Sequence, residues 1–322
     1  MPRKLARIAL RSIGPALLAI VVWRMKDRGA IVEVLGRATL APLVLAVALN
    51  AINVHLKVIR WDVLLRTRGI HYPQRRAWGA FMTSLYLGML TPGRVGDVLR
   101  VQYLRHDLGV PYAEGLASVV MDRFCDLYVL VAFVAVGVAR YSSVVVGQLA
   151  WITWLAVALT ALGPLVFLVP GLAEGTMGAV YRRLAKGDEA GLARFLEALR
   201  ANVGRPLLVT IPLTVATFVV NYIQGWLIAR SLGLDIGIFD VTCLLAIANL
   251  LGLLPISISG VGVREAFFAL VFPVLGYRPE AGVSFGLLVF VVIYLAIVLA
   301  GAVSWQMAPP PTGPGAVGTP RP

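Results

Sequence analysis

Long apolar segments alternate with short polar ones along most of this chain. A helix needs about 20 apolar residues to cross the hydrocarbon core of a membrane. Six segments reach about that length and are predicted to be full spans: Leu5–Trp23, Thr39–Val58, Ala117–Ala139, Leu149–Val169, Leu207–Ala229 and Val283–Met307. The first has a basic start like a signal peptide, but no small-x-small cleavage site precedes its end, so we expect a retained span.

Two further apolar regions, Trp78–Leu104 and Val241–Leu275, are interrupted by proline and glycine. Irregular backbone at membrane depth is tolerated only where it is buried in protein or faces a wet cavity. Glycine also lets another group approach the backbone closely. We therefore expect hinges or close approaches at Pro92, Gly93, Gly96, Pro255, Gly260 and Gly262.

Basic residues are concentrated in a few connecting segments. Lys57–Arg76 and Gly171–Arg205 carry six Lys or Arg each, whereas Arg140–Gln148 and Ser231–Asp240 carry almost none. The positive-inside rule places the basic segments, and with them both termini, in the cytoplasm. Arg24–Ala38 is the exception, because its four basic residues fall on the predicted outer side.

The same rule predicts how the two broken regions are threaded. If Trp78–Leu104 crossed fully, the basic segment Gly171–Arg205 would lie outside, whereas a re-entrant hairpin keeps it inside. Three full spans then separate the two hairpins, so they would enter from opposite faces as an inverted repeat. We predict an all-α polytopic membrane protein with about six full spans and two re-entrant helical hairpins. The alternative is two kinked but complete spans.

Composition agrees with a membrane protein and excludes other classes. Hydrophobic residues make up 59% of the 322 residues and charged residues 14%, against about 25% charged in a soluble domain. The net charge of +13 comes from basic residues in the connecting segments, as the positive-inside rule describes, so we expect no nucleic-acid partner. Two isolated cysteines and three scattered histidines predict neither a disulfide framework nor a metal site, and no cofactor is expected.

We expect one membrane domain over residues 1–307, placed in the plasma (inner) membrane as a multi-pass protein. Residues 171–205 are predicted to be a cytoplasmic loop with an amphipathic helix, whose pattern is clearest over Ala190–Leu199. Residues 308–322 are rich in proline and glycine and are predicted to be a disordered tail.

The first candidate for chemistry follows the first break. A charge within the bilayer is costly, so it persists only where it is paired or lines a wet cavity. A helix that begins near Val95 would bring Asp97 and Arg100 onto one face, close enough to pair, with Arg94 at its positive end. Arg94 or Arg100 could then hold a lipid phosphate, or an internal ion pair could simply pin the hairpin.

The second candidate is the run Asp122-Arg123-x-x-Asp126, whose carboxylates share a helix face. Paired carboxylates could serve acid–base catalysis or bind a metal. We favour the reading that they neutralise arginines of the first hairpin, because that avoids uncompensated buried charge.

The third candidate repeats the plan of the first, with Ser257, Ser259, Arg264 and Glu265 around the second break. No G-x-S-x-G elbow and no nearby histidine support a nucleophilic serine, so no catalytic residue is assigned.

Polar side chains within the spans are expected to make interhelical hydrogen bonds, or alternatively to line a hydrophilic groove. They are Asn50, Asn53, His55, Asn221, Gln224 and Asn249. Arg60-Trp61-Asp62 follows the second predicted span, where Trp61 suits the membrane interface.

Four separated motifs together resemble the transmembrane region of lysylphosphatidylglycerol synthases, the flippase-like domain family. They are Arg60-Trp61, Pro92-Gly93-Arg94-x-Gly96-Asp97-x-x-Arg100, Asp122-Arg123-x-x-Asp126 and Pro255-x-Ser257-x-Ser259-Gly260-x-Gly262-x-Arg264-Glu265. They occur in the family's order over roughly Leu5 to Met307, and Asp97 stands where the family often has Glu. The resemblance implies a domain that moves a phospholipid or lipid-linked headgroup between leaflets. Bifunctional relatives add a soluble aminoacyltransferase domain, whereas this chain ends in its proline-rich tail, so lysylphosphatidylglycerol synthesis is not expected.

The leading hypothesis is therefore a transporter that translocates an anionic phospholipid or lipid-linked phosphate headgroup. Its partners would be membrane lipids, and an oligomer is left open. No G-x-x-x-x-G-K-[ST] motif is present, so transport would be passive, ion-coupled or driven by a partner. The substrate-binding residues would be Arg94, Asp97, Arg100, Asp122, Arg123, Asp126, Ser257, Ser259, Arg264 and Glu265.

Two alternatives stay open. One is an intramembrane enzyme, or an enzyme subunit, that acts on a lipid phosphate or lipid-linked sugar through Asp122 and Asp126. The other is a scaffold for a separate lipid-synthesising enzyme. The sequence favours a protein that is not an enzyme, since it shows no soluble catalytic domain.

Overall fold

A computed structural model of the chain describes residues 29–91, 96–141, 189–253 and 260–311, together with Trp23 and Ala158. Every regular element in these ranges is helical. Six residues with expected roles lie outside the described residues: Pro92, Gly93, Arg94, Pro255, Ser257 and Ser259. The same holds for Leu5–Trp23 and Leu149–Val169, apart from Trp23 and Ala158.

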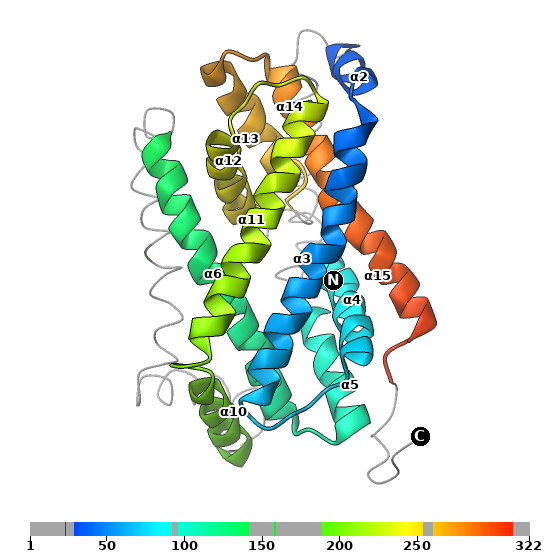
Figure 1. Cartoon of the computed structure of the whole chain (residues 1–322), viewed down its shortest axis with the longest axis vertical. Coiled ribbons are helices and arrows are strands. Elements are labelled where there is room, and N and C mark those ends of the chain that lie inside the picture. Colours follow the sequence, from blue (N-terminus) through cyan, green and yellow to red (C-terminus); the bar gives the residue numbers. More distant parts are fainter. Residues whose placement is uncertain are drawn as a thin grey trace, which may run out of the picture.

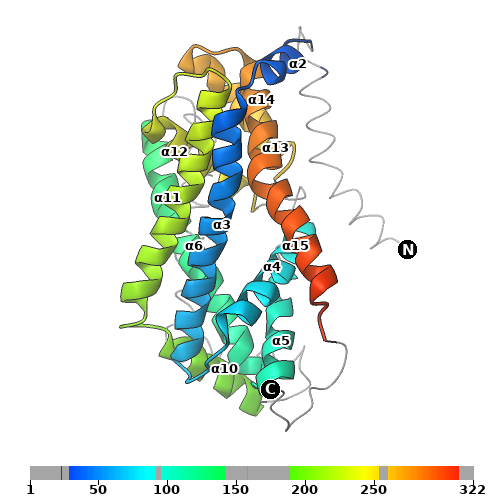
Figure 2. The same ribbon diagram turned by 45° about the vertical axis from the view of Figure 1, so that its right-hand side comes forward.

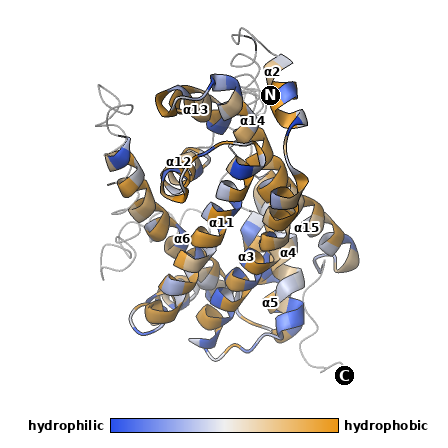
Figure 3. Ribbon diagram, turned by 45° about the horizontal axis from the view of Figure 1, so that its top comes forward, coloured by the Kyte–Doolittle hydropathy of each residue, from blue (hydrophilic) through white to orange (hydrophobic). Residues whose placement is uncertain are grey.

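Long helices form the body of the molecule. They are α3 (Leu40–Arg66), α6 (Tyr112–Arg140), α11 (Leu207–Ser231) and the nearly continuous helix Pro279–Met307. Figure 3 shows that hydrophobic residues dominate these ribbons. Among the described residues, α3, α11 and Pro279–Met307 are long and apolar enough to cross a membrane. The all-α membrane fold is thus confirmed.

Charge explains why α6 does not join that group. It has 29 residues, enough to span, but it carries Asp122, Arg123 and Asp126 in its N-terminal half. Its C-terminal half is apolar and packs against α12 in the largest cluster of buried hydrophobic residues among those described.

The first broken region contains α4 (Gln74–Leu90) and α5 (Leu99–Leu108), which pack against each other. Figures 1 and 2 place this pair in the lower part of the molecule, beside the ends of α3 and α6. The chain enters α4 from the lower end of α3 and leaves α5 for the lower end of α6.

The second broken region contains α12 (Ile238–Leu251), α13 (Val263–Val271) and the short turn η3 (Phe272–Leu275). The helices α12 and α13 lie in the upper part of the molecule (Figure 1). Gly260 and Gly262 have φ of +79° and +88°, a conformation that glycine adopts without steric cost, just before α13 begins. The two helix pairs therefore lie toward opposite ends of the molecule, as the prediction of two hairpins requires. That they re-enter a membrane and form an inverted repeat stays a prediction.

The helix Pro279–Met307 is not regular throughout. It consists of α14 (Pro279–Val289), the π-helical turn η4 (Phe290–Leu295) and α15 (Ala296–Met307). Asn50 Nδ2 donates a hydrogen bond of 2.8 Å to the carbonyl of Val292 within this wide turn. Such turns are rare and frequently occur at functional sites.

Two helices lie at the ends of the bundle. α2 (Gly29–Gly36) falls within Arg24–Ala38, the segment that is an exception to the positive-inside rule. α10 (Glu189–Ala201) matches the helix expected over Ala190–Leu199. Its apolar side packs on α6 and α3 through Phe195 and Leu199, so protein rather than lipid covers it.

Candidate functional site

A cluster of six buried or half-buried charges joins α3, α5 and α6, and we call it the ion cluster. Its members are Arg60, Asp97, Arg100, Asp122, Arg123 and Asp126. Three guanidinium groups face three carboxylates, so the formal charges balance. Balanced pairing is what allows such charges to remain inside an apolar bundle.

Asp122 lies at the centre of the ion cluster and is fully buried. Its Oδ1 accepts a 2.8 Å hydrogen bond from Arg60 Nε. Its Oδ2 accepts from Arg100 Nη2 at 2.7 Å and from Arg123 Nη2 at 2.9 Å. One carboxylate therefore holds arginines from three helices. This geometry agrees with the expectation that the α6 carboxylates neutralise an arginine of the first hairpin.

The expected ion pair between Asp97 and Arg100 is not formed. A 3-10 turn over residues 96–98 carries Asp97 and leads directly into α5, which begins at Leu99. Asp97 Oδ2 is 3.4 Å from Arg123 Nη1, and Arg100 bonds Asp122 instead. The first hairpin is thus tied to α6 by two ion pairs rather than to itself.

The expectation that Trp61 faces the membrane interface is wrong, because protein covers its side chain. The preceding residue, Arg60, is buried as well. Both side chains are fully buried, because α3 continues to Arg66 instead of ending near Val58. Arg60 Nη1 donates to Asp126 Oδ1 at 2.6 Å and to Thr214 Oγ1 at 2.8 Å. Trp61 Nε1 donates to Ser118 Oγ at 3.0 Å.

Arg100 is also held by aromatic rings. Its guanidinium carbon lies 5.0 Å from the ring centre of Trp61 and 4.7 Å from that of Phe81. A cation over an aromatic face is stabilised by the ring quadrupole. Arg100 is therefore fixed in place and 99% buried, which suits a structural role better than contact with a ligand.

The second hairpin presents a smaller charged pair. Glu265 accepts the backbone N–H of Gly262 and faces Arg264 Nε across 3.4 Å. The Arg264 guanidinium lies over the ring of Tyr294, 4.6 Å from its centre. Arg264 is 2% exposed, and its Nη2 has no hydrogen-bond partner among the described residues.

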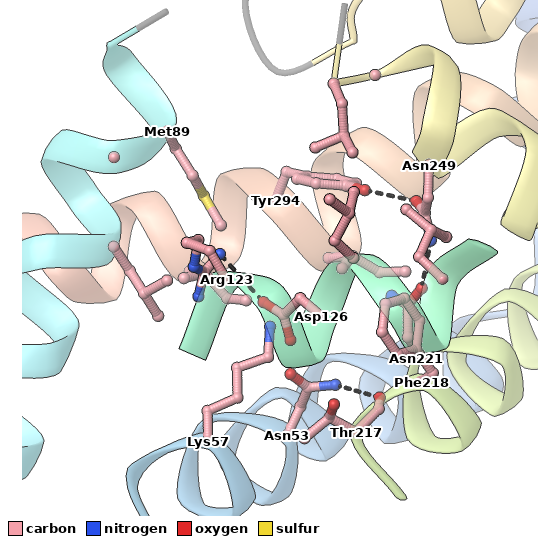
Figure 4. A pocket seen from close by; sticks show the side chains of 18 of the residues that line it. Asn53, Lys57, Met89, Arg123, Asp126, Thr217, Phe218, Asn221, Asn249 and Tyr294 are labelled. Atoms are coloured by element: carbon pink, nitrogen blue, oxygen red, sulfur yellow. Dashed lines mark hydrogen bonds and ion pairs between the residues drawn. The ribbon is translucent and has the colours of Figure 1, made fainter. Parts of the chain in front are cut away.

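A cavity of about 390 Å³ lies between the two hairpins, and we call it the central cavity. Its charged lining residues are Lys57, Arg123, Asp126 and Arg264, three cations and one carboxylate. Figure 4 shows Arg123 and Asp126 on one side, with the Lys57 amine directed toward Asp126. The central cavity thus joins the ion cluster to the arginine of the second hairpin.

Three amides also line the central cavity: Asn53 lies beside Lys57 and Asp126, whereas Asn221 and Asn249 lie farther from Arg123 (Figure 4). Asn53 Nδ2 donates to the carbonyl of Thr217 at 2.8 Å, and Asn249 Nδ2 donates to Asn221 Oδ1 at 3.1 Å. Gln224 Nε2 bonds the carbonyl of Ala46 and Asn50 Oδ1 outside the cavity. Each of these amides makes a hydrogen bond to another helix, as expected. Asn53, Asn221 and Asn249 also line the cavity.

The structure therefore sorts the predicted residues into groups. Arg123, Asp126 and Arg264 line the central cavity, whereas Arg100 and Asp122 lie behind it in the ion cluster. Lys57 and Arg60 were counted as loop cations and were missed as site residues. Val58, Trp61 and Leu65 recur at helical spacing, and this pattern was the signal that α3 continues through Arg60.

Comparison with known proteins identifies the family of this chain. Residues 11–301 match the family described as the lysylphosphatidylglycerol synthase TM region. The chain belongs to this family. The match includes both hairpins and the entire ion cluster.

Individual relatives are distant but cover most of the chain. A UPF0104 membrane protein from Methanothermobacter thermautotrophicus is 22% identical over 81% of this chain and 89% of its own length. One from Methanocaldococcus jannaschii is 23% identical over 89% of this chain and 90% of its own length. The glycosyltransferase AglD from Haloferax volcanii is 25% identical over 82% of this chain, which corresponds to 47% of AglD.

Proposed function

We propose that this membrane protein translocates lipids whose headgroup carries a phosphate, either an anionic phospholipid or a lipid-linked phosphate. The observation that carries the proposal is the central cavity, which is lined by Arg123 of the ion cluster together with Lys57 and Arg264. Membership of a lipid-related family supports the same function.

The physical task is to lower the cost of moving a charged headgroup through hydrocarbon. An unpaired ion in that medium costs at least several kcal/mol. Cationic side chains on the cavity wall would replace water around the phosphate, while the acyl chains stay in the surrounding lipid. Asp126 and the ion cluster would keep the arginines in position between transport events.

The two helix pairs would supply the movement. In this proposal α4–α5 and α12–α13 are re-entrant hairpins that enter from opposite faces and meet at the central cavity. Small displacements of one pair against the other would open the cavity alternately to each leaflet, as in transporters built from inverted repeats.

A vesicle assay tests this function. The purified protein is reconstituted with a phosphatidylglycerol labelled on an acyl-chain end, and an impermeant quencher reports the fraction in the outer leaflet over time. We expect the native protein to speed translocation over protein-free vesicles. Arg264→Gln should slow it about tenfold or more, because a charge-assisted hydrogen bond contributes about 1.5–3 kcal/mol.

The matched control is Arg230→Gln, since Arg230 is a half-exposed arginine paired with Asp235, outside the cavity lining. It should translocate lipid at the native rate. If the native protein does not speed translocation of phosphatidylglycerol or of a polyprenyl phosphate, the transporter proposal is wrong.

A second candidate is supported by the similarity to the glycosyltransferase AglD. In that case the chain would be an enzyme or enzyme subunit that acts on a lipid-linked sugar, with Asp126 facing the cavity as the reactive carboxylate. Sugar transfer by the purified chain that requires a divalent metal and is lost in Asp126→Asn would favour this candidate. A partner enzyme that copurifies with the chain would favour a subunit role.

A further inference from the structure

The central cavity contains a hydrogen-bonded row that phosphate binding alone does not explain. Tyr294 Oη donates to Asn249 Oδ1 at 2.9 Å, and Asn249 Nδ2 donates to Asn221 Oδ1 at 3.1 Å. The three side chains come from η4, α12 and α11, and all line the cavity (Figure 4). We call them the amide row.

The direction of these bonds leaves groups free at both ends of the amide row. Asn221 contributes only its oxygen, so among the described residues its Nδ2 makes no hydrogen bond. Tyr294 donates its proton, so the lone pairs of its oxygen can still accept. The wall therefore offers an unused amide donor and an unused phenolic acceptor to a ligand.

Arg264 adds a charged donor next to the amide row. Its guanidinium is stacked over the Tyr294 ring, and its buried Nη2 has no partner among the residues that the structure describes. A buried donor without a partner is destabilising, more so when the group is charged, and a ligand oxygen would remove that cost. Charged and neutral hydrogen-bonding groups thus lie together on one wall.

We propose that the headgroup bound here is a phosphorylated polyol or sugar rather than a bare phosphate. This inference rests on the proposed function and specifies its substrate class. Hydroxyl groups both donate and accept, so they match the amide of Asn221 and the oxygen of Tyr294, while Arg264 binds the phosphate. The volume of about 390 Å³ lies within the range of ligand pockets, roughly 300–1,000 Å³, so the cavity suits a headgroup rather than long acyl chains.

Binding to the purified full chain tests the proposal. Titration calorimetry in detergent compares four probes: dihexanoyl phosphatidylinositol, dihexanoyl phosphatidic acid, inositol 1-phosphate and inorganic phosphate. We expect phosphatidylinositol to bind about 3- to 10-fold tighter than phosphatidic acid, the range that one or two neutral hydrogen bonds provide. Asn221→Leu should bring that ratio to about one while phosphatidic acid still binds.

The control is Gln74→Leu, which removes an exposed amide outside the cavity lining and should keep the native ratio. Asn221→Asp is a second variant for the case that the leucine variant fails to fold, because its carboxylate can still accept the bond from Asn249 but has no N–H group to donate to the ligand. It should also lose the preference. Thermal unfolding of each variant confirms that it is folded before titration.

The outcomes separate the two proposals. Equal binding of both lipids to the native chain overturns the polyol inference but leaves an Arg264-dependent lipid transporter intact. No binding of either lipid overturns both. If inositol 1-phosphate binds as tightly as phosphatidylinositol, the hydroxyl recognition is supported, because the cavity holds the headgroup while the acyl chains stay outside it, and the vesicle assay then decides whether the ligand is a lipid.

Discussion

At the scale of single residues, Asp122 organises the largest number of buried charges. It accepts hydrogen bonds from Arg60, Arg100 and Arg123, and it is fully buried. Breaking a buried ion pair by removing one partner costs more than the pair contributes, because the other charge is left without compensation. Asp122 therefore acts mainly as a scaffold for the arginines.

Asp122→Asn should lower the free energy of unfolding by about 3–5 kcal/mol, the usual cost of leaving a buried charge unpaired. A thermal-unfolding series of the detergent-purified protein measures this as a lower Tm. The control is Asp235→Asn, because the Asp235 side chain is 87% exposed in its pair with Arg230 and should leave Tm unchanged. Equal Tm values for native and Asp122→Asn would contradict the scaffold role.

Sequence reasoning found three members of the ion cluster on α6 because i and i+4 residues share a helix face, as Asp122 and Asp126 do. It missed Arg60, because hydropathy near Val58 suggested the end of a span when the helix continues for two more turns. It also paired Asp97 with the wrong arginine. A partner 26 residues away on another helix is set by tertiary packing, which spacing along one segment does not report.

At the scale of helices, the first hairpin depends on a close approach between its two arms. A Cβ atom added to Gly96 would overlap the backbone of Leu87 and Gly88 at the end of α4. A Cβ added to Gly88 would in turn overlap the Asp97 carboxylate. These two glycines bring the turn that carries Asp97 against α4, within reach of Arg123.

Gly96→Ala should therefore destabilise the hairpin by about 1–3 kcal/mol, the cost of overpacking against backbone that cannot move aside. The measurement is again thermal unfolding, with lipid translocation as a second readout. Gly36→Ala is the matched control, because an added Cβ there meets nothing within 4 Å. A Gly96→Ala protein as stable as the control would show that the hairpin can relax.

The glycine-rich breaks were visible in the sequence, since Gly96, Gly260 and Gly262 interrupt otherwise apolar runs. Their physical roles differ and could not be predicted individually. Gly96 provides space for neighbouring backbone, whereas Gly260 and Gly262 provide positive φ. Only the three-dimensional path of the chain distinguishes these two needs.

At the scale of the whole molecule, the segments around His71 and Asp235 lie at opposite ends of α3 and α11 (Figures 1 and 2). The helix α4 follows the first segment with Arg75 and Arg76, whereas the stretch Leu232–Asp240 contains no basic residue. The positive-inside rule therefore assigns His71 to the cytoplasm and Asp235 to the outside.

A labelling experiment checks this orientation. Asp235→Cys should react with a membrane-impermeant maleimide on intact cells, whereas His71→Cys should react only after permeabilisation. Both native residues are exposed, and the native cysteines, Cys125 and Cys243, are buried, so the unmodified chain serves as the background control. The reverse labelling pattern would invert the predicted topology and place the termini outside.

The wide turn at Phe290–Leu295 has a consequence for how the protein can change through insertion and deletion. One residue in an α-helix corresponds to a rotation of about 100°. Shortening this turn by one residue would thus swing Gly301 and Ser304, which pack on α4, toward a different neighbour while the helix axis stays in place. Length variation at this single point would re-aim α15 relative to the first hairpin without lengthening any loop.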